Sequence, residues 1–331
     1  MTYVLVIGAG LAGCTAALQM ADMGMDVILV EKENAIGGKV RHYGCKATDK
    51  CNNCGVCLTG NLWSSVEKNP KIETILSSEI IDFSGTKGDF CATVMTPKGK
   101  RYLSRLDSVV ICTGFEKASN KNTAHLQIEG RDGIITGSEI EELMLDRSKE
   151  KVLKRAPKSV AFIQCFGSRD KNEGANYCSR VCCSYSTRAA KVLRHYYPDC
   201  EIALLYMELQ SVHSKGCYNE LIDKNVEFIK CRPLKIKGGN SVSIQYDDPA
   251  EGMKTREFDL VVLSEGIHPP SENQAVAATY GLAQDENGFI HTLDDCEGVH
   301  VAGCAKKPMK IDETYADSLS IARMVAFGAE S

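Results

Sequence analysis

The sequence predicts an α/β protein in which a second dinucleotide-binding-type domain is inserted into the first. Three observations predict this fold. A glycine-rich turn follows an apolar strand in residues 3–13, a second strand–helix–strand unit begins near Ser159, and an apolar strand ending in glycine returns at 298–303. Strands that alternate with helices favour a doubly wound parallel sheet, and the late return of the chain favours an insertion.

Composition fits a globular protein of this kind. The chain has 331 residues, enough for two domains, with 25% charged residues and a formal net charge of -4, which argues against binding to nucleic acid. No apolar run approaches the roughly 18 residues of a membrane span. The apolar start lacks a basic flank, so we expect a first strand and not a signal peptide. Sixteen cysteines at tight spacings in a long chain favour metal ligands in a reducing, cytoplasmic compartment over disulfides.

The first elements follow from the N-terminal pattern. Residues 3–7 are continuously apolar and predict a buried strand, and the turn at 8–13 leads into a helix over 11–23. Gly24 ends that helix, and residues 26–30 form the second parallel strand.

The remaining elements are shorter. Hairpin-like strands are expected at 72–76, 79–83, 90–96, 101–104 and 108–112. A helix at 138–145 lies in a charged connector, 117–157. The second unit is expected to hold a strand at 160–164, a helix at 179–195, a strand at 201–206, a helix near 215–225, a strand at 227–229, a hairpin over 234–258 and a strand at 260–263. A strand at 298–303 and a helix at 314–327 close the chain.

The glycine turn carries the first chemical signal. Gly8 permits the tight turn, Gly10 lets the backbone approach a pyrophosphate, and Gly13 allows the helix to touch the strand. The helix N-terminus then faces the phosphates. Glu31 ends the second strand and can accept hydrogen bonds from ribose hydroxyls.

Three further stretches resemble the flavoproteins with two dinucleotide-binding domains, of thioredoxin-reductase type. They are the paired glycines after Glu31, residues 109–114 ending in Thr-Gly, and residues 298–303. The resemblance implies FAD. The residues implied to contact it are Gly8, Gly10, Leu11, Ala12, Gly13, Glu31, Lys32, Gly37, Gly38, Lys39, Ile80, Thr113, Gly114, Gly303, Cys304, Thr314, Tyr315 and Ala316. The helix beginning at Thr314 is expected to aim backbone N–H groups at the flavin ring.

The resemblance also sets the expected domains. The FAD-binding domain comprises 1–150, with a cysteine-rich insertion at 42–60, and 271–331. The inserted domain comprises 151–270. Its first strand runs into Cys165, where a nucleotide turn would have its first glycine, and only Gly167 remains. We therefore expect weak or no NAD(P)H binding.

Four cysteines of the inserted domain form the strongest metal signal. Cys165, Cys178, Cys182 and Cys183 fall within 19 residues, without the C-x2-C pair of zinc ribbons. Soft thiolates suit iron–sulfur clusters or zinc. Adjacent cysteines are awkward as a disulfide but can bind two irons of one cuboidal cluster. The last three are expected at a helix start, whose positive dipole end favours an anionic centre.

Residues 164–170 and 177–183 closely resemble the family of heterodisulfide reductase A subunits. The resemblance implies a 4Fe-4S cluster on these four cysteines near FAD, iron–sulfur partners resembling the B and C subunits of heterodisulfide reductase, and a homodimer. Large members of that family place a lysine near the flavin, five residues after the second adjacent cysteine. This chain has Arg188 there, which is assigned as the candidate catalytic residue although it cannot release a proton.

A second cysteine group precedes these motifs. Cys45, Cys51, Cys54 and Cys57 follow a ferredoxin-like spacing, but no Cys-Pro follows the run. A 4Fe-4S cluster, a zinc ion and a redox-active dithiol all remain open here. Most other cysteines are expected to be core thiols: 14, 91, 112, 200, 217, 231, 296 and 304.

The predicted function is that of an FAD- and 4Fe-4S-containing electron-transfer subunit in a heterodisulfide-reductase-like oxidoreductase complex. Two-electron flavin chemistry would be split into single-electron transfer through the cluster. The alternatives are a stand-alone NAD(P)H-dependent disulfide or ferredoxin oxidoreductase, and a non-catalytic scaffold that uses FAD and metal for stability.

Overall fold

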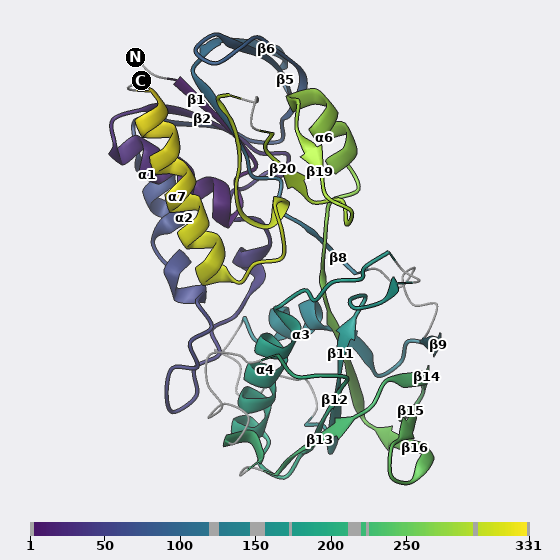
Figure 1. Ribbon diagram of the computed structural model, residues 1–331. Coiled ribbons are helices and arrows are strands. Elements are labelled where there is room, and N and C mark those ends of the chain that lie inside the picture. Colours follow the sequence, from purple (N-terminus) through teal and green to yellow (C-terminus); the bar gives the residue numbers. More distant parts are fainter. Residues whose placement is uncertain are drawn as a thin grey trace. The chain divides into compact units, whose positions relative to one another are not determined.

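The computed structural model describes residues 3–118, 126–145, 156–171, 174–210, 220–222, 225–293 and 297–329. These form two compact α/β units (Figure 1). The first comprises residues 1–41, 55–116 and 269–331, and the second comprises 42–54 and 117–268. The predicted fold class, with one α/β unit inserted into another, is confirmed.

The first unit is built on a five-stranded sheet in the order β21-β7-β1-β2-β3. Its strands are β1 (Tyr3–Ile7), β2 (Asp26–Val30), β3 (Ile72–Ile75), β7 (Ser108–Ile111) and β21 (Val299–Val301), and all pairs are parallel. The three central strands, β7, β1 and β2, are buried on both faces and are almost entirely apolar.

Alternate side chains of this sheet enter two separate cores. One face packs against α1 (Leu11–Asp22) and α7 (Ile311–Ala329) (Figure 1). The other face packs against the antiparallel sheet of β4 (Glu79–Ser84), β5 (Phe90–Thr96) and β6 (Gly99–Leu106). Short elements complete the unit: η1 (Gly38–His42), η2 (Val56–Thr59), α2 (Leu62–Lys68), α6 (Asn273–Tyr280), β19 (Ala283–Gln284), β20 (Ile290–His291) and η4 (Gly303–Ala305).

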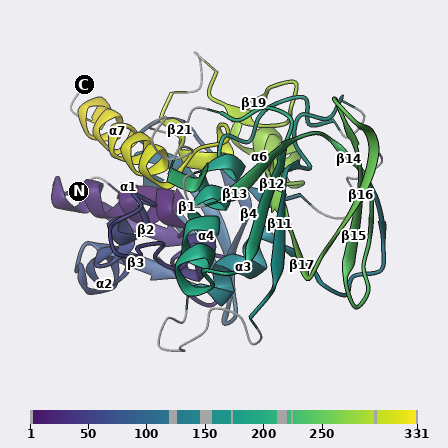
Figure 2. The same cartoon turned by 90° about the horizontal axis from the view of Figure 1, so that it is seen from below.

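The second unit has three layers (Figure 2). The middle layer is the parallel sheet β10 (Ile134–Thr136), β17 (Leu260–Glu265), β11 (Ser159–Phe166), β12 (Glu201–Tyr206) and β13 (Val226–Lys230). One face is covered by α3 (Gly137–Leu143) and α4 (Cys182–Tyr196). The other is covered by the sheet β16 (Gly252–Phe258), β15 (Val242–Asp248), β14 (Pro233–Lys237) and β9 (Gln127–Glu129). A two-stranded pair joins β8 (Glu116–Lys117) to β18 (Ile267–His268).

The compact units differ from the predicted boundaries in two places. The connector assigned to the first domain supplies β9, β10 and α3 to the second unit, because β10 pairs with β17 and β9 pairs with β14. Only part of the predicted cysteine-rich insertion, residues 42–54, belongs with the second unit. The predicted boundary at 150 lies outside the described residues.

Helix limits also shift relative to the sequence. α4 begins at Cys182, so Cys178 precedes the helix and does not lie in its first turn. α7 begins three residues before the predicted Thr314. Most of the helix expected at 215–225 lies outside the described residues.

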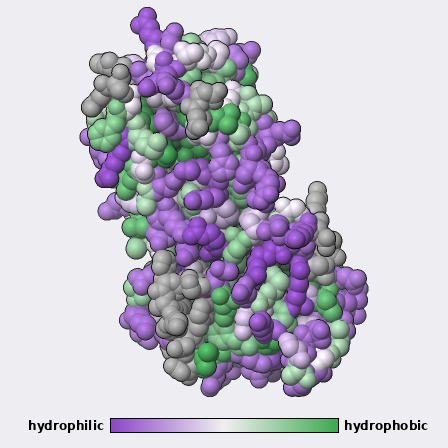
Figure 3. Space-filling view, in the orientation of Figure 1, coloured by the Kyte–Doolittle hydropathy of each residue, from purple (hydrophilic) through white to green (hydrophobic). Residues whose placement is uncertain are grey.

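Among the described residues, none of the helices combines the length and hydropathy needed to cross a bilayer. On the face drawn in Figure 3, hydrophilic residues are spread over both units and hydrophobic residues form small patches.

Candidate functional site

The glycine turn after β1 contains two glycines required by packing and one that leaves space open. A Cβ on Gly13 would lie 1.8 Å from the carbonyl oxygen of Gly8, and a Cβ on Gly8, at φ +97°, would lie 2.5 Å from that of Cys112. A Cβ on Gly10 would meet nothing within 4 Å. The space over Gly10 lies at the start of α1, where the sequence predicts a pyrophosphate.

The paired glycines predicted beside the pyrophosphate lie directly on this turn. The N–H of Gly37 donates to the carbonyl of Ala9 at 2.7 Å. A Cβ on Gly38 would come within 2.9 Å of the Cα of Gly10. Both residues have positive φ, which favours glycine. The two motifs therefore form one continuous backbone surface, as their resemblance to flavoproteins implied.

The Glu31 carboxylate is buried at the edge of the same turn. Its two oxygens accept the N–H of Ala9 at 2.6 Å and the N–H of Glu33 at 2.9 Å. These bonds fix the carboxylate at the end of β2, where it can still accept a ribose hydroxyl through its remaining lone pairs.

Thr113 presents a polar atom that lacks a partner within the described structure. Its Oγ1 is buried and makes no hydrogen bond there. Gly114 follows with φ +78° and open space at its Cβ position. A buried hydroxyl without a partner is unfavourable by about 1–3 kcal/mol, so this residue suits a bound polar group.

The late strand approaches the turn from the other side. A Cβ on Gly303 would lie 2.7 Å from the Cβ of Ala12. The N–H of Gly303 donates to Asp317 Oδ2 at 2.8 Å, and Asp317 also pairs with Lys306 at 2.7 Å. Cys304 is buried and its thiol points to the carbonyl of Met309 at 3.6 Å, a packing arrangement. Sequence spacing had given no signal for Asp317 or Lys306.

The start of α7 corrects one expectation. The N–H of Thr314 donates to the carbonyl of Lys310 at 2.8 Å, so it is already used inside the helix. Thr314 is buried, Tyr315 is half-buried against the first core, and Ala316 is exposed.

The other implied FAD contacts are spread around the unit. Lys32 pairs with Glu272 at 3.1 Å, and Lys39 lies over the ring of Phe115 at 5.0 Å. Leu11 is buried beneath the turn, and Ile80 packs against the second core of the unit.

In the second unit, three of the four predicted cysteines form one buried cluster. Cys165 ends β11, while Cys182 and Cys183 begin α4. The Cys182 thiol hydrogen-bonds to both other sulfurs, which holds the pKa of Cys165 below its usual value and brings that of Cys183 to about 7. Its own pKa is raised well above the usual value for the same reason. The guanidinium of Arg169 adds a further contact to Cys165.

Strained backbone accompanies this cluster. Cys165, Arg169 and Arg180 all have φ near +60°, a region that costs non-glycine residues energy. Such outliers concentrate at functional sites.

Hydrogen bonds divide the cysteines into two kinds. The sulfurs of Cys45, Cys51 and Cys178 each accept the backbone N–H two residues later, at 3.3–3.5 Å. By contrast, Cys14 and Cys200 donate their S–H groups to carbonyls. Accepting N–H bonds is the behaviour expected of a thiolate ligand, whereas donating is that of a core thiol. Cys51 does both, because its S–H also donates to Asn53 Oδ1 at 3.7 Å. Cys217 and Cys296 lie outside the described residues.

Within the described ranges, no group of three or more His, Cys, Asp or Glu side chains forms a metal-ion site. Cys178 is half-buried and stands apart from the buried three, although the charges of Cys165 and Cys183 raise its pKa in addition to burial. The predicted ligand set is therefore brought together only in part.

The second cysteine group lies on a surface loop. Cys45 and Cys51 are exposed and Cys54 is half-buried on the 42–54 loop of the second unit, while Cys57 is exposed in η2 of the first unit. Arg188 contacts this loop: its Nε donates to the carbonyl of Asn52 at 2.9 Å and its Nη2 to that of Asn53 at 2.6 Å. The resemblance had suggested a flavin-related role for Arg188 and not this contact.

The glycines at the end of β11 and at Gly266 leave no free space at their Cβ positions, unlike Gly10 in the first turn. A Cβ on Gly167 would lie 2.2 Å from that of Ala118, and one on Gly266 would lie 2.0 Å from Ser168 Oγ. α4 begins only at Cys182, so no helix N-terminus follows directly on this turn. Weak or absent NAD(P)H binding stays a prediction.

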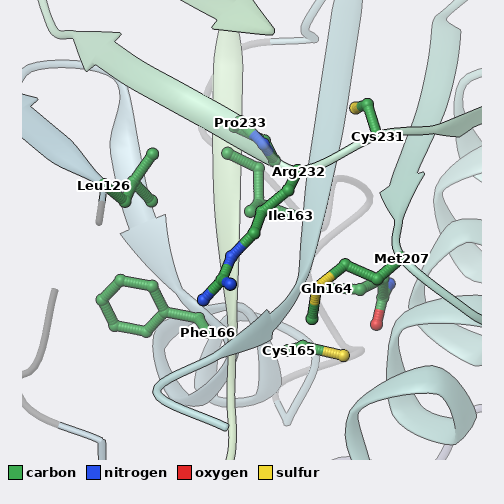
Figure 4. Close-up of a pocket in the computed structure, with 9 residues that line it drawn as sticks. All are labelled: Leu126, Ile163, Gln164, Cys165, Phe166, Met207, Cys231, Arg232 and Pro233. Atoms are coloured by element: carbon green, nitrogen blue, oxygen red, sulfur yellow. The ribbon is translucent and has the colours of Figure 1, made fainter. Parts of the chain in front are cut away.

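A small cavity adjoins Cys165 (Figure 4). Its volume is about 10 Å³, roughly the space of one water. Gln164 lines it, and both polar atoms of its buried amide make no hydrogen bond among the described residues. In Figure 4 this amide and the Cys165 sulfur project to the same side of the strand. Gln164 was not identified from the sequence.

Comparison with known proteins shows which proteins the chain resembles. Residues 3–69 match the family model of FAD dependent oxidoreductases. The chain is 25% identical, over 97% of its length, to an iron-sulfur A subunit of the CoB--CoM heterodisulfide reductase of Methanopyrus kandleri. It is 26% identical, over 97% of its length, to the A subunit of the H(2):CoB-CoM heterodisulfide,ferredoxin reductase of Methanothermobacter marburgensis. The chain spans 63% of the length of each of these two relatives.

Solved structures support the fold. The thioredoxin reductase of T. acidophilum superposes with a TM-score of 0.68 at 18% identity, covering 99% of this chain and 98% of that one. The Lactococcus lactis thioredoxin reductase superposes with a TM-score of 0.66 at 17% identity, covering all of both chains. The chain thus has the thioredoxin-reductase fold, matches the FAD dependent oxidoreductase family over residues 3–69, and is similar over 97% of its length to heterodisulfide reductase A subunits.

Proposed function

We propose that the chain carries FAD and a 4Fe-4S cluster and transfers electrons within a heterodisulfide-reductase-like complex. The observation that carries this proposal is the buried cluster of Cys165, Cys182 and Cys183 at the end of β11, where a second nucleotide turn would have its first glycine. In other proteins a domain of this fold binds a second nucleotide, whereas in this proposal it provides the sulfur ligands of a cluster.

The first unit fits FAD. Gly10 leaves the cradle open, and Glu31 is held at the ribose position. Thr113 offers a buried hydroxyl that a bound polar group would satisfy. FAD supplies the exchange of two electrons, and the protein residues bind the cofactor, orient it and exclude water from it.

The second unit fits a cluster ligated by four cysteines. Cys165, Cys182, Cys183 and Cys178 are the proposed ligands, and iron–sulfur bonds would replace the S–H hydrogen bonds among the first three. A cuboidal cluster binds each thiolate at a different iron, so its ligands need not converge on one point. Arg169 beside Cys165 would offset the negative charge of the thiolates.

The spacing of Cys45, Cys51, Cys54 and Cys57 supports a second 4Fe-4S cluster. The N–H bond that Cys45 accepts favours a thiolate over a packed thiol. Because three of the four are exposed, this centre would be placed to exchange electrons with a partner.

The partners in this proposal are iron–sulfur proteins that resemble the B and C subunits of heterodisulfide reductase. The relatives are named as A subunits, which implies further subunits for those proteins. A homodimer and a cytoplasmic location belong to the same proposal. The alternative of a stand-alone NAD(P)H-dependent oxidoreductase is not favoured, since the β11 turn offers no cradle.

A serine substitution tests the ligand assignment. After anaerobic purification and dithionite reduction, Cys182→Ser is expected to lose the EPR signal of one cluster and to retain FAD. Cys200→Ser is the matched control, because Cys200 is equally buried and donates to a carbonyl, as serine can. A Cys182→Ser protein with all signals intact would overturn the ligand set.

A further inference from the structure

The side chain of Arg188 holds the turn between Cys51 and Cys54 through two hydrogen bonds. The two middle residues of this turn, Asn52 and Asn53, both offer their carbonyls to the guanidinium of Arg188, at 2.9 Å and 2.6 Å. The fork of an Arg side chain can hold two acceptors in a fixed geometry, which a Lys ammonium cannot do. The contact therefore fixes the segment that sets the spacing of the two cysteines.

The turn itself has the geometry of a ligand-bearing loop. Asn53 has φ +49°, and its N–H donates to Cys51 Sγ at 3.4 Å. The side chain of Asn52 donates to the carbonyl of Lys46 at 2.6 Å, which closes the loop on itself. The carbonyls of Asn52 and Asn53 both accept from Arg188.

Other contacts attach the same loop to the second unit. Lys46 forms an ion pair with Glu141, with only 3% and 9% of the two side chains exposed. Asp49 lies 3.4 Å from His195, which is seven residues after Arg188 on α4 and so on the same helix face. These contacts hold other parts of the loop, and Arg188 holds the part between the two cysteines.

We propose that Arg188 is a positioning residue for a metal centre on the second cysteine group. It holds Cys51 and Cys54 at ligand spacing through the backbone between them. The inference rests on the proposed function, because it requires a metal centre on this group. It replaces the flavin-tuning role that the family resemblance had suggested with a role at the cysteine loop.

The test compares Arg188→Met, Arg188→Lys and Arg194→Met. Methionine keeps an unbranched apolar stem but removes all donors. Arg194 is the matched control, because it lies on the same helix and donates to the carbonyls of Pro198 and Asn225, away from the cysteine loop. Iron, sulfide and zinc are counted in each anaerobically reconstituted protein, EPR spectra are recorded, and metal loss to a chelator is timed.

Arg188→Met is expected to lose metal from the second group about 10- to 100-fold more readily, as for other residues that orient ligands. Its EPR signal should be lost or altered, while FAD and the first cluster stay. Arg188→Lys should recover part of the loss, and Arg194→Met should resemble the wild type. An Arg188→Met protein with unchanged metal retention and spectrum would overturn the inference while leaving the second centre in place. A wild type with one centre only would instead remove the second site itself, and the inference with it.

Discussion

At the scale of single residues, three glycines within one motif have different physical roles. Gly8 and Gly13 are required by the protein itself, because a side chain at either would collide with backbone. Gly10 is not required by the protein, because space lies open at its Cβ position. We therefore assign Gly10 to leaving space for the cofactor.

This difference predicts opposite phenotypes for two alanine variants. Gly13→Ala should lower the free energy of unfolding of the FAD-free protein by about 1–3 kcal/mol or more. Gly10→Ala should change it by less than about 1 kcal/mol but weaken FAD binding at least about tenfold. Urea unfolding of the FAD-free protein and a fluorescence titration with FAD provide the two measurements. Equal effects of both variants on stability and on affinity would refute the assignment.

At this scale, the sequence predicted some contacts and missed others. The motif at Gly8–Gly13 and the Gly37–Gly38 pair were predicted, because their function depends on residue type at short spacing. Asp317, Gln164 and Arg169 were missed. Their roles depend on which way a side chain turns, and sequence carries little signal for that.

At the scale of elements, the 42–54 loop shows how a cysteine-bearing segment is attached. The Lys46–Glu141 pair is almost fully buried, and Lys46 also donates to the carbonyl of Gly44. Despite the nearby ammonium of Lys46, burial raises the pKa of Glu141. A pair of this kind is costly to break because one charge is left unpaired in the interior.

Glu141→Gln is therefore expected to reduce the free energy of unfolding by about 3–5 kcal/mol. The comparison is Glu73→Gln, which breaks the exposed pair with Arg101 and should cost less than about 1 kcal/mol. Chemical denaturation of both variants under one set of conditions measures the difference. A similar small cost for the two variants would mean that the Lys46 pair does not anchor the loop.

Elements were predictable where their pattern is long and local. The β1–turn–α1–β2 start was predicted almost to the residue, because apolar runs and glycine punctuation are both strong there. β9 and β10 were missed, since each has three residues and pairs with a strand more than a hundred residues away. The start of α4 was placed too early, because the segment before Cys182 is held by long-range hydrogen bonds, such as that from Ser179 to the carbonyl of Ile267.

At the scale of the whole molecule, the two units differ at the turn after their first long parallel strand. The turn after β1 leaves free space at Gly10, whereas Gly167 and Gly266, at what we call the closed turn, leave none. Two-nucleotide flavoproteins need both turns to pass a hydride from a nicotinamide to the flavin.

The closed turn predicts that NADH and NADPH reduce the bound flavin slowly or not at all, whereas dithionite reduces it fully. Anaerobic stopped-flow absorbance at the flavin band measures both reactions. Bleaching by either pyridine nucleotide within a turnover time of about 0.1 s, the median for enzymes, would contradict the assignment of the second unit.

The central claim is that thiolates of the second unit hold an inorganic cluster in a protein that also binds FAD. It is tested most directly by counting flavin, iron and acid-labile sulfide in the anaerobically purified wild type, with EPR after reduction. We predict one FAD and about eight irons with matching sulfide per chain, four irons for each cysteine group, or about four if only the first group binds a cluster. FAD-loaded protein with neither iron nor sulfide, and with Cys165, Cys182 and Cys183 recovered as free thiols or a disulfide, would contradict the account.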